Sequence, residues 1–291
     1  MAGVGYLLNR TSLKLDTESI GRLVLWIGTP SLVFSSLTSP KFSAVALTTT
    51  VQAAIAVVLL AAVLSALSLI VMRQPVRTFL PSLTVPNSGN MGLPILLLAF
   101  GEEGLAVGVA YFFVIAIIQH TISPMIVIGE MNIRRIFKEP LIYSVMAVIF
   151  FRVTGFTPHA TLIDTTRILG GMMIPLMVIL LGYSLATLKV SDMVLSVKLA
   201  VARLLIGMAS GSAIIWAFGL EGVVAGSVFL MASMPSAIII YIFALRYDKA
   251  PRRIAGLIVV STVMTFCALP FLLWIAQDIS EGRNPLLAPF M

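Results

Sequence analysis

Residues 86–94 read PNSGNMGLP and interrupt an otherwise apolar stretch, FLPSLTVPNSGNMGLPILLLAF (79–100). Two prolines, two glycines, two asparagines and a serine fall within these nine residues. Unpaired backbone groups cost several kcal/mol each in a lipid bilayer, so a break survives only inside protein or beside a water-filled cavity. The stretch therefore predicts a membrane helix that is broken for a function.

The rest of the chain has the composition of a polytopic membrane protein. Of its 291 residues, 59% are hydrophobic and 11% charged, and the mean hydropathy is +1.07; soluble domains carry about 25% charged residues. The net charge of +7 is spread over short hydrophilic gaps, so we expect a lipid bilayer and no nucleic acid as partner. The single cysteine, Cys267, excludes an internal disulfide framework.

Nine apolar segments are long enough to cross a bilayer as helices, which takes about 20 residues. These spans are 19–38, 45–72, 75–101, 104–128, 140–157, 162–188, 193–218, 220–247 and 250–277. The first residues, MAGVGYLL (1–8), resemble the stump of a tenth span. We therefore expect an all-α membrane protein with nine full spans and a truncated N-terminal first helix.

The Lys and Arg residues of the loops predict the orientation of the chain. Twelve of them fall in alternate loops: Arg10, Lys14, Arg73, Arg77, Arg134, Arg135, Lys138, Lys189, Arg246, Lys249, Arg252 and Arg253. The intervening loops and the tail hold only Lys41 and Arg283. Because basic loops stay in the cytoplasm, we expect loop 129–139 inside and the C-terminus outside a plasma membrane.

Prolines recur at nearly one offset in the two halves of the chain. The pairs are Pro30 and Pro175 (145 apart, each eight residues after an arginine), Pro86 and Pro235 (149 apart), and Pro124 and Pro270 (146 apart). Chance alignment is the alternative, since prolines are frequent in membrane helices, but broken segments at corresponding positions are typical of transporter repeats. We predict a first repeat (1–128), a cytoplasmic loop (129–139), a second repeat (140–277) and a tail (278–291). Each span and its counterpart are five positions apart in the order of spans, and an odd step gives opposite orientations, so the repeats are inverted.

In the first break, Pro86, Gly89, Gly92 and Pro94 interrupt the helix, and the glycines permit unusual backbone angles. Asn90 is expected to cap a new half-helix with Pro94 in its first turn. Asn87 and Ser88 remain in the gap with free side-chain donors and acceptors.

The second break, MASMPSAIII (231–240), contains Ser233 as a cap before Pro235, and Ser236 after it. If both broken helices cross near the membrane midplane, two helix N-termini point at one place and favour an anion there. The predicted substrate-binding residues are Asn87, Ser88, Asn90, Ser233 and Ser236. Simple proline kinks are the alternative, which explains the second break more readily than the first.

Other intramembrane polar residues have weaker interpretations. Gln119 and His120 either support the substrate site or a proton relay, or form a helix–helix hydrogen bond. The basic residues near span starts are expected to reach the membrane surface with their charged ends, or snorkel; these are Arg22, Arg167, Lys198 and Arg203. No metalloprotease, nucleophile-elbow or P-loop motif is present, so no metal, cofactor or enzymatic activity is expected.

Four stretches resemble the auxin efflux carrier family, part of the bile acid/auxin transporter superfamily. They are GYLLNRTSLKLDTESIGRLVLWIGTPSLVFSSL (5–37), PNSGNMGLPILLLAFGEEGL (86–105), IPLMVILLGYSLA (174–186) and MPSAIIIYIFALRYD (234–248). The resemblance implies two inverted five-helix repeats, an elevator-like carrier that is often dimeric, and a scaffold that includes 19–38, 140–157 and 162–188. It also implies organic anions as substrates. Compared with that family, the short 129–139 loop favours a bacterial-type carrier of malate or malonate, in the inner membrane of a bacterium, over one of auxin.

The predicted function is secondary active transport of small organic anions, mono- or dicarboxylates, bound at the helix crossing. The expected partners are the bilayer, this anion and, as the resemblance implies, a second copy of the chain. The alternative is a membrane sensor or scaffold that binds a small ligand without transporting it. No fused signalling domain accompanies the predicted spans, which counts against this alternative.

Overall fold

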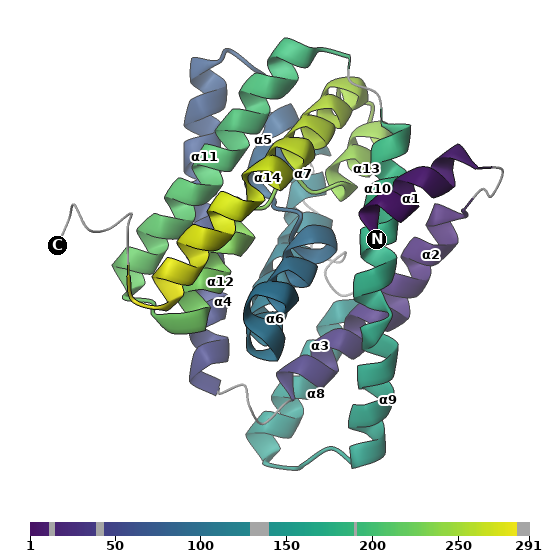
Figure 1. Ribbon diagram of the computed structural model, residues 1–291, viewed down its shortest axis with the longest axis vertical. Coiled ribbons are helices and arrows are strands. Elements are labelled where there is room, and N and C mark those ends of the chain that lie inside the picture. Colours follow the sequence, from purple (N-terminus) through teal and green to yellow (C-terminus); the bar gives the residue numbers. More distant parts are fainter. Residues whose placement is uncertain (12–14, 39–43, 129–139, 189–190, 284–291) are drawn as a thin grey trace.

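The computed structural model describes residues 1–11, 15–38, 44–128, 140–188 and 191–283, and its regular elements there are all helical (Figure 1). Six helical runs are long and apolar enough to cross a membrane: Ser19–Leu37, Val45–Val71, Ser88–Ile128, Ala160–Thr187, Met193–Phe218 and Pro251–Ser280. Two shorter apolar helices cover Ile142–Phe151 and Gly222–Ser233. The expected all-α polytopic class is confirmed, while the count of nine spans remains a prediction.

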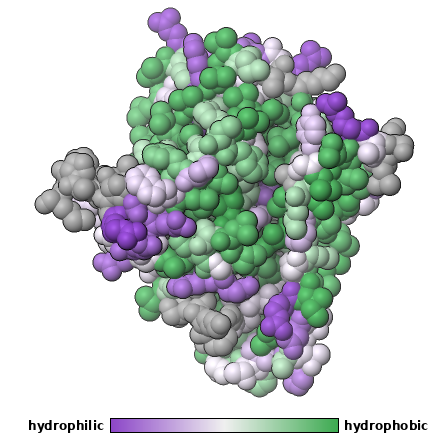
Figure 2. All heavy atoms as spheres, in the orientation of Figure 1, coloured by the Kyte–Doolittle hydropathy of each residue, from purple (hydrophilic) through white to green (hydrophobic). Residues whose placement is uncertain are grey.

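Large apolar side chains cover the outside of these helices. Leu59, Val71, Leu98 and Phe150 are all more than half exposed, and apolar residues dominate the face shown in Figure 2. A surface of this kind is stable in lipid and unfavourable in water. The outside of the fold therefore exposes apolar side chains where a soluble protein would expose polar ones, as a bilayer requires.

One group of helices comes from the start of the chain and from its middle. It comprises α1 (Ala2–Arg10), α2 (Thr17–Leu23), the π-turn η1 (Val24–Gly28), α3 (Thr29–Leu37), α8 (Pro140–Thr154), α9 (Ala160–Gly171) and α10 (Met173–Thr187). In this first group, α1 packs on α10, and α3 packs on α8 and α9 (Figure 1). A Cβ atom added to Gly170 of α9 would lie 2.6 Å from the Cα atom of Leu32 in α3, so these two backbones are almost in contact.

A second group contains both helix breaks and most of the buried core. It comprises α4 (Ala44–Val71), α5 (Val76–Thr84), η2 (Ser88–Gly92), α6 (Leu93–Ile117), η3 (Ile118–Ile122), α7 (Ser123–Ile128), α11 (Met193–Phe218), α12 (Gly222–Ser233), α13 (Ile239–Arg246) and α14 (Pro251–Ser280). Helix α11 packs against α4, α12 and α14, and α12 also packs against α6. The second group therefore surrounds the broken segments with helices on several sides.

Helix α6 reverses direction at Gly101, whose φ of 62° and ψ of −151° only glycine adopts readily. A Cβ atom on Gly108 would lie 2.6 Å from Leu96 Cδ1 and 3.1 Å from Leu93 Cδ2. The leg that starts at Ser88 is thus followed by a second, antiparallel leg packed against it. The reversal falls in the acidic sequence GEEG (101–104).

The two groups meet along few elements. Helix α3 packs on α6, and α10 packs on η2 and, less extensively, on α6. In Figure 1, α6 lies between α4, α11, α12 and α14 on one side and α3, α8, α9 and α10 on the other. The first break is therefore placed where the two groups face each other.

Candidate functional site at the helix crossing

The two breaks are joined directly by their backbones. Pro86 stands opposite Ser236 in an isolated antiparallel β-bridge. Two hydrogen bonds flank it, from the amide of Asn87 to the carbonyl of Pro235 (2.7 Å) and from the amide of Ala237 to the carbonyl of Val85 (3.2 Å). Backbone groups released by the breaks thus bond to each other, which satisfies the requirement that a membrane interior imposes. We call residues 85–87 and 235–237 the crossing.

The prolines occupy positions of the crossing that need no N–H group. Pro86 lies between the two hydrogen bonds, and Pro235 contributes only its carbonyl. Proline also prevents continuation of the preceding helix because it lacks a donor and its ring clashes. The amide of Ser236 donates to the hydroxyl of Ser261 on α14 (3.3 Å), so a neighbouring helix supports the crossing.

The half-helices begin and end at other residues than the sequence predicted. The carbonyl of Asn87 accepts from the amides of Met91 (3.3 Å) and Gly92 (3.1 Å), so Asn87, and not Asn90, is the N-cap residue. Asn90 lies half-buried inside the π-turn η2. The predicted capping role of Ser233 is also wrong, because Ser233 is the last residue of α12 and α13 begins only at Ile239.

The glycines of the first break act through their small size. Neither Gly89 nor Gly92 has a positive φ, which corrects the expected unusual backbone angles. A Cβ atom on Gly92 would lie 2.5 Å from Met231 Sδ, and one on Gly89 would lie 2.9 Å from Phe112 Cε2. The absent side chains let η2 pack tightly against α12 and the second leg of α6. Pro94 lies at the start of α6, where its missing N–H group costs little.

Four predicted binding residues bury polar side-chain atoms that have no hydrogen-bond partner among the described residues. These atoms are Asn87 Nδ2, Ser88 Oγ, Ser233 Oγ and Ser236 Oγ, and their residues are at most 4% exposed. Thr84 Oγ1, just before the crossing, is in the same state. Leaving such a group unpaired costs about 1–3 kcal/mol, and buried polar atoms in native proteins are nearly always paired. The crossing and the residues directly beside it therefore have donors and acceptors to offer to a ligand.

Gln119 and His120 lie apart from the crossing bonds, in the π-turn η3. His120 Nδ1 lies 2.9 Å from the carbonyl oxygen of Ala116, and its ring meets that of Phe243 on α13 edge-on, with centroids 6.5 Å apart. This contact links η3, which continues the second leg of α6, to α13, the helix that follows the second break. In the described part of the chain, His, Cys, Asp and Glu residues form no group of three that could hold a metal ion.

Arg203 is a residue of this region that sequence reasoning missed. The side chain was expected to reach the membrane surface, but Arg203 is only 1% exposed. Its Nη2 atom donates to the carbonyl of Ala232 (2.9 Å), one residue before Ser233. The available signal was its depth, ten residues beyond Met193 in an apolar segment with Gly207 and Gly211 on the same helix.

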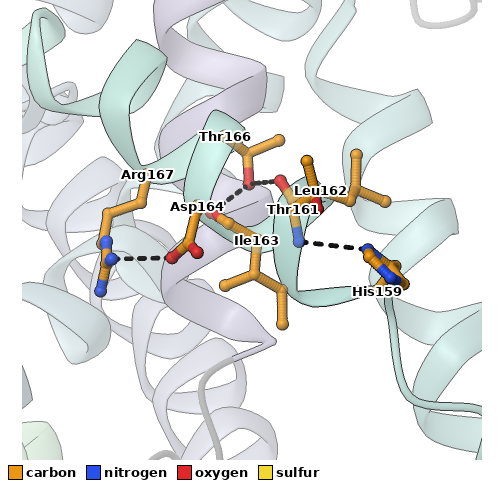
Figure 3. A network of polar contacts seen from close by, with 7 residues as sticks. All are labelled: His159, Thr161, Leu162, Ile163, Asp164, Thr166 and Arg167. Carbon is orange, nitrogen blue, oxygen red and sulfur yellow. Dashed lines mark hydrogen bonds and ion pairs between the residues drawn. The ribbon is translucent and has the colours of Figure 1, made fainter.

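The other basic residues of the predicted set are on the surface. Lys198 and Arg22 are exposed. Arg167 forms an ion pair with Asp164 (2.7 Å) in the first turns of α9, where His159 Nδ1 also accepts from the amide of Thr161 (3.3 Å) (Figure 3). These contacts stabilise the start of α9 and do not reach the crossing.

The fold and the crossing define a helical membrane protein with two broken helices that meet backbone to backbone. The family described as Mem_trans, membrane transport protein, matches residues 119–275, more than half of the chain. The chain belongs to this family, and the expected relationship to the auxin efflux carriers is confirmed. The matched region includes the second break. A comparison with curated proteins finds no match.

Proposed function

We propose that the chain is a secondary active carrier of small organic anions, such as mono- or dicarboxylates, and that the crossing is its substrate site. Membership of a membrane transport family supports the carrier function. The observation that carries the site assignment is the group of buried polar atoms on Asn87, Ser88, Ser233 and Ser236 that find no hydrogen-bond partner in the described part of the chain. A substrate that pairs with them recovers the cost of their burial.

An anion fits this site better than a cation. The side-chain Nδ2 of Asn87 and the serine hydroxyls can donate hydrogen bonds to a carboxylate. The helical leg from Ser88 and helix α13 both begin beside the crossing, and helix N-termini carry partial positive charge and free N–H groups. Asn90, half-buried in η2, adds another amide at the edge of the site.

The hydrogen bonds of the crossing support an inverted repeat. Val85 and Pro235 are 150 residues apart, and so are Asn87 and Ala237. Each residue of one hydrogen bond therefore corresponds to a residue of the other, donor to donor and acceptor to acceptor. A two-fold axis between the halves of the chain would relate the two bonds in this way. The sequence offsets of 145–149 lie close to this value. We therefore assign the first repeat to residues 1–128 and the second to residues 140–277.

The packing supports alternating access by relative movement of the two helix groups. The second group carries the whole crossing, and the first group contacts it through α3 and α10. If the second group slides past the first, a carboxylate bound at the crossing passes from one side of the membrane to the other. Because the inside of a bacterial cell is electrically negative, the potential favours export of an anion.

Reconstituted protein tests this assignment by the flux of labelled malate, malonate and indole-acetate. Asn87→Ala removes a side-chain donor but keeps the backbone bonds of the crossing, so we expect at least about a tenfold loss of flux, the worth of one hydrogen bond to a charged group. Asn9→Ala on α1 is the matched control and should transport normally. Unchanged flux in Asn87→Ala would show that the substrate binds elsewhere.

A further inference from the structure

Arg203 carries a buried charge that the described residues do not neutralise. The residue is 1% exposed, and its Nε atom is buried with no hydrogen-bond partner among the described residues. Arg167 and Arg283, both well exposed, form ion pairs in the described part of the chain, whereas Arg203 forms none with a described residue. An unpaired charge in a membrane interior is expensive and marks a functional position. Arginine also keeps its proton where other side chains would lose theirs.

The guanidinium group is held at the broken end of α12. Helix α12 ends at Ser233, so the carbonyl of Ala232 is among those left without a partner inside the helix. Arg203 donates to this carbonyl. Gly207 lies one turn later on α11, and its lack of a side chain lets α11 approach the same carbonyl closely. A Cβ atom on Gly207 would also lie 3.1 Å from Arg203 Nη1. The cation therefore offsets the negative C-terminal end of α12 beside the crossing.

A buried phenol accompanies this cation. The hydroxyl of Tyr111 is fully buried without a hydrogen-bond partner in the described part, and it interacts electrostatically with Arg203. The next residue, Phe112, packs on Gly89 of η2. Arg203 is thus linked to the second break through Ala232. Tyr111 is linked to the first break through its neighbour Phe112.

We propose that Arg203 is the residue that makes the carrier select carboxylates over uncharged solutes. This proposal rests on the proposed function. Arg203 neutralises the partial negative charge at the end of α12. The partial positive charges of the helix N-termini at the crossing are then left without a counter-charge. A bound carboxylate supplies this negative charge. Because α11 belongs to the same helix group as the crossing, the cation travels with the site.

The travelling cation has an electrical consequence. An empty site carries one positive charge across part of the membrane field, and a site that holds a dicarboxylate carries one net negative charge. Removing the cation leaves the total charge per cycle unchanged but makes the return of the empty site independent of voltage.

The test compares wild type with Arg203→Gln, Arg203→Lys and the control Lys198→Gln, which removes an exposed cation from the same helix. The probes are malate, malonate and indole-acetate, each against its uncharged amide. Arg203→Gln should lower the preference for carboxylate over amide at least about tenfold, since a hydrogen bond to a charged group contributes about 1.5–3 kcal/mol. Arg203→Lys should keep most of this preference, and Lys198→Gln all of it. An unchanged preference in Arg203→Gln overturns the proposal.

A second measurement needs no variant that might fail to fold. Voltage steps applied to wild-type protein without substrate should produce a transient charge movement, and its absence overturns the proposal. Failure of the proposed function is distinguishable, because wild type would then transport none of the three carboxylates. If wild type transports one of them and Arg203→Gln retains the preference, only the role of Arg203 is wrong.

Discussion

Asn87 shows how one residue serves both the fold and the site. Its amide bonds to Pro235 and its carbonyl begins the helical leg from Ser88, so its backbone holds the crossing together. Its side-chain nitrogen has no partner among the described residues. Substitution of the side chain should therefore change the chemistry of the site and leave the crossing intact.

Asn87→Asp tests the sign of the substrate charge. The two side chains have nearly the same shape, but a carboxylate would repel an anion where Asn87 donates a hydrogen bond. We expect carboxylate flux in reconstituted vesicles to fall below that of Asn87→Ala, more than about tenfold below wild type. Asn9→Asp on α1 should transport normally. Flux in Asn87→Asp equal to or above that of Asn87→Ala would argue against an anionic substrate.

For single residues, the sequence predicted which polar residues gather at the breaks better than it predicted the role of each one. The combination of Asn and Ser with prolines predicted where polar groups gather, because such groups are expensive in a membrane. The capping roles of Asn90 and Ser233 were wrong because a π-turn and an extended segment are formed by the meeting of two distant breaks. Arg203 was missed because burial depends on how α11 packs against α12, which one segment does not show.

The ends of a helix were easier to predict from the sequence than the distant segments that it contacts. The expected span 193–218 coincides with α11, Met193–Phe218. The side chain of Asp192 accepts from the amide of Leu195 at its start, and Gly219 adopts a left-handed conformation at its end; both are local signals that sequence displays. The β-bridge between residues 86 and 236 is non-local, and only the matching positions of the prolines indicated it.

Close contact between α9 and α3 predicts a difference between two adjacent glycines. In Gly170→Ala the new Cβ would press on the backbone of Leu32, whereas a Cβ on Gly171 has no neighbouring atom within 4 Å. Overpacking costs about 1–3 kcal/mol, so Gly170→Ala should unfold at a lower temperature in detergent than wild type. Gly171→Ala is the control and should equal or exceed wild type, because alanine favours helix. Equal destabilisation by both substitutions would contradict this packing.

At the scale of the whole molecule, helix ends beside three of the loops predicted to be cytoplasmic lie together in the described part of the chain. The end of α4 and the starts of α11 and α14 surround one surface pocket, with Gln74, Asp192, Lys198 and Arg253 in its lining. Arg73, Arg252 and Arg253 beside these helix ends are exposed. Basic residues beside three of the loops predicted to be cytoplasmic therefore lie near one another, and the orientation given by the positive-inside rule stays a prediction.

The charge asymmetry predicts that loop 129–139 and the C-terminus lie on opposite sides of the membrane. Alkaline phosphatase, which is active only outside the cytoplasm, should be active when fused after Arg283 and inactive when inserted between residues 129 and 139. A fluorescent protein that matures only in the cytoplasm should give the reverse result at both sites. Opposite sides require an odd number of membrane passes between the two sites, and the predicted nine spans place five there. Reporters on the same side would make that number even, and the nine-span arrangement would then be wrong whatever the substrate.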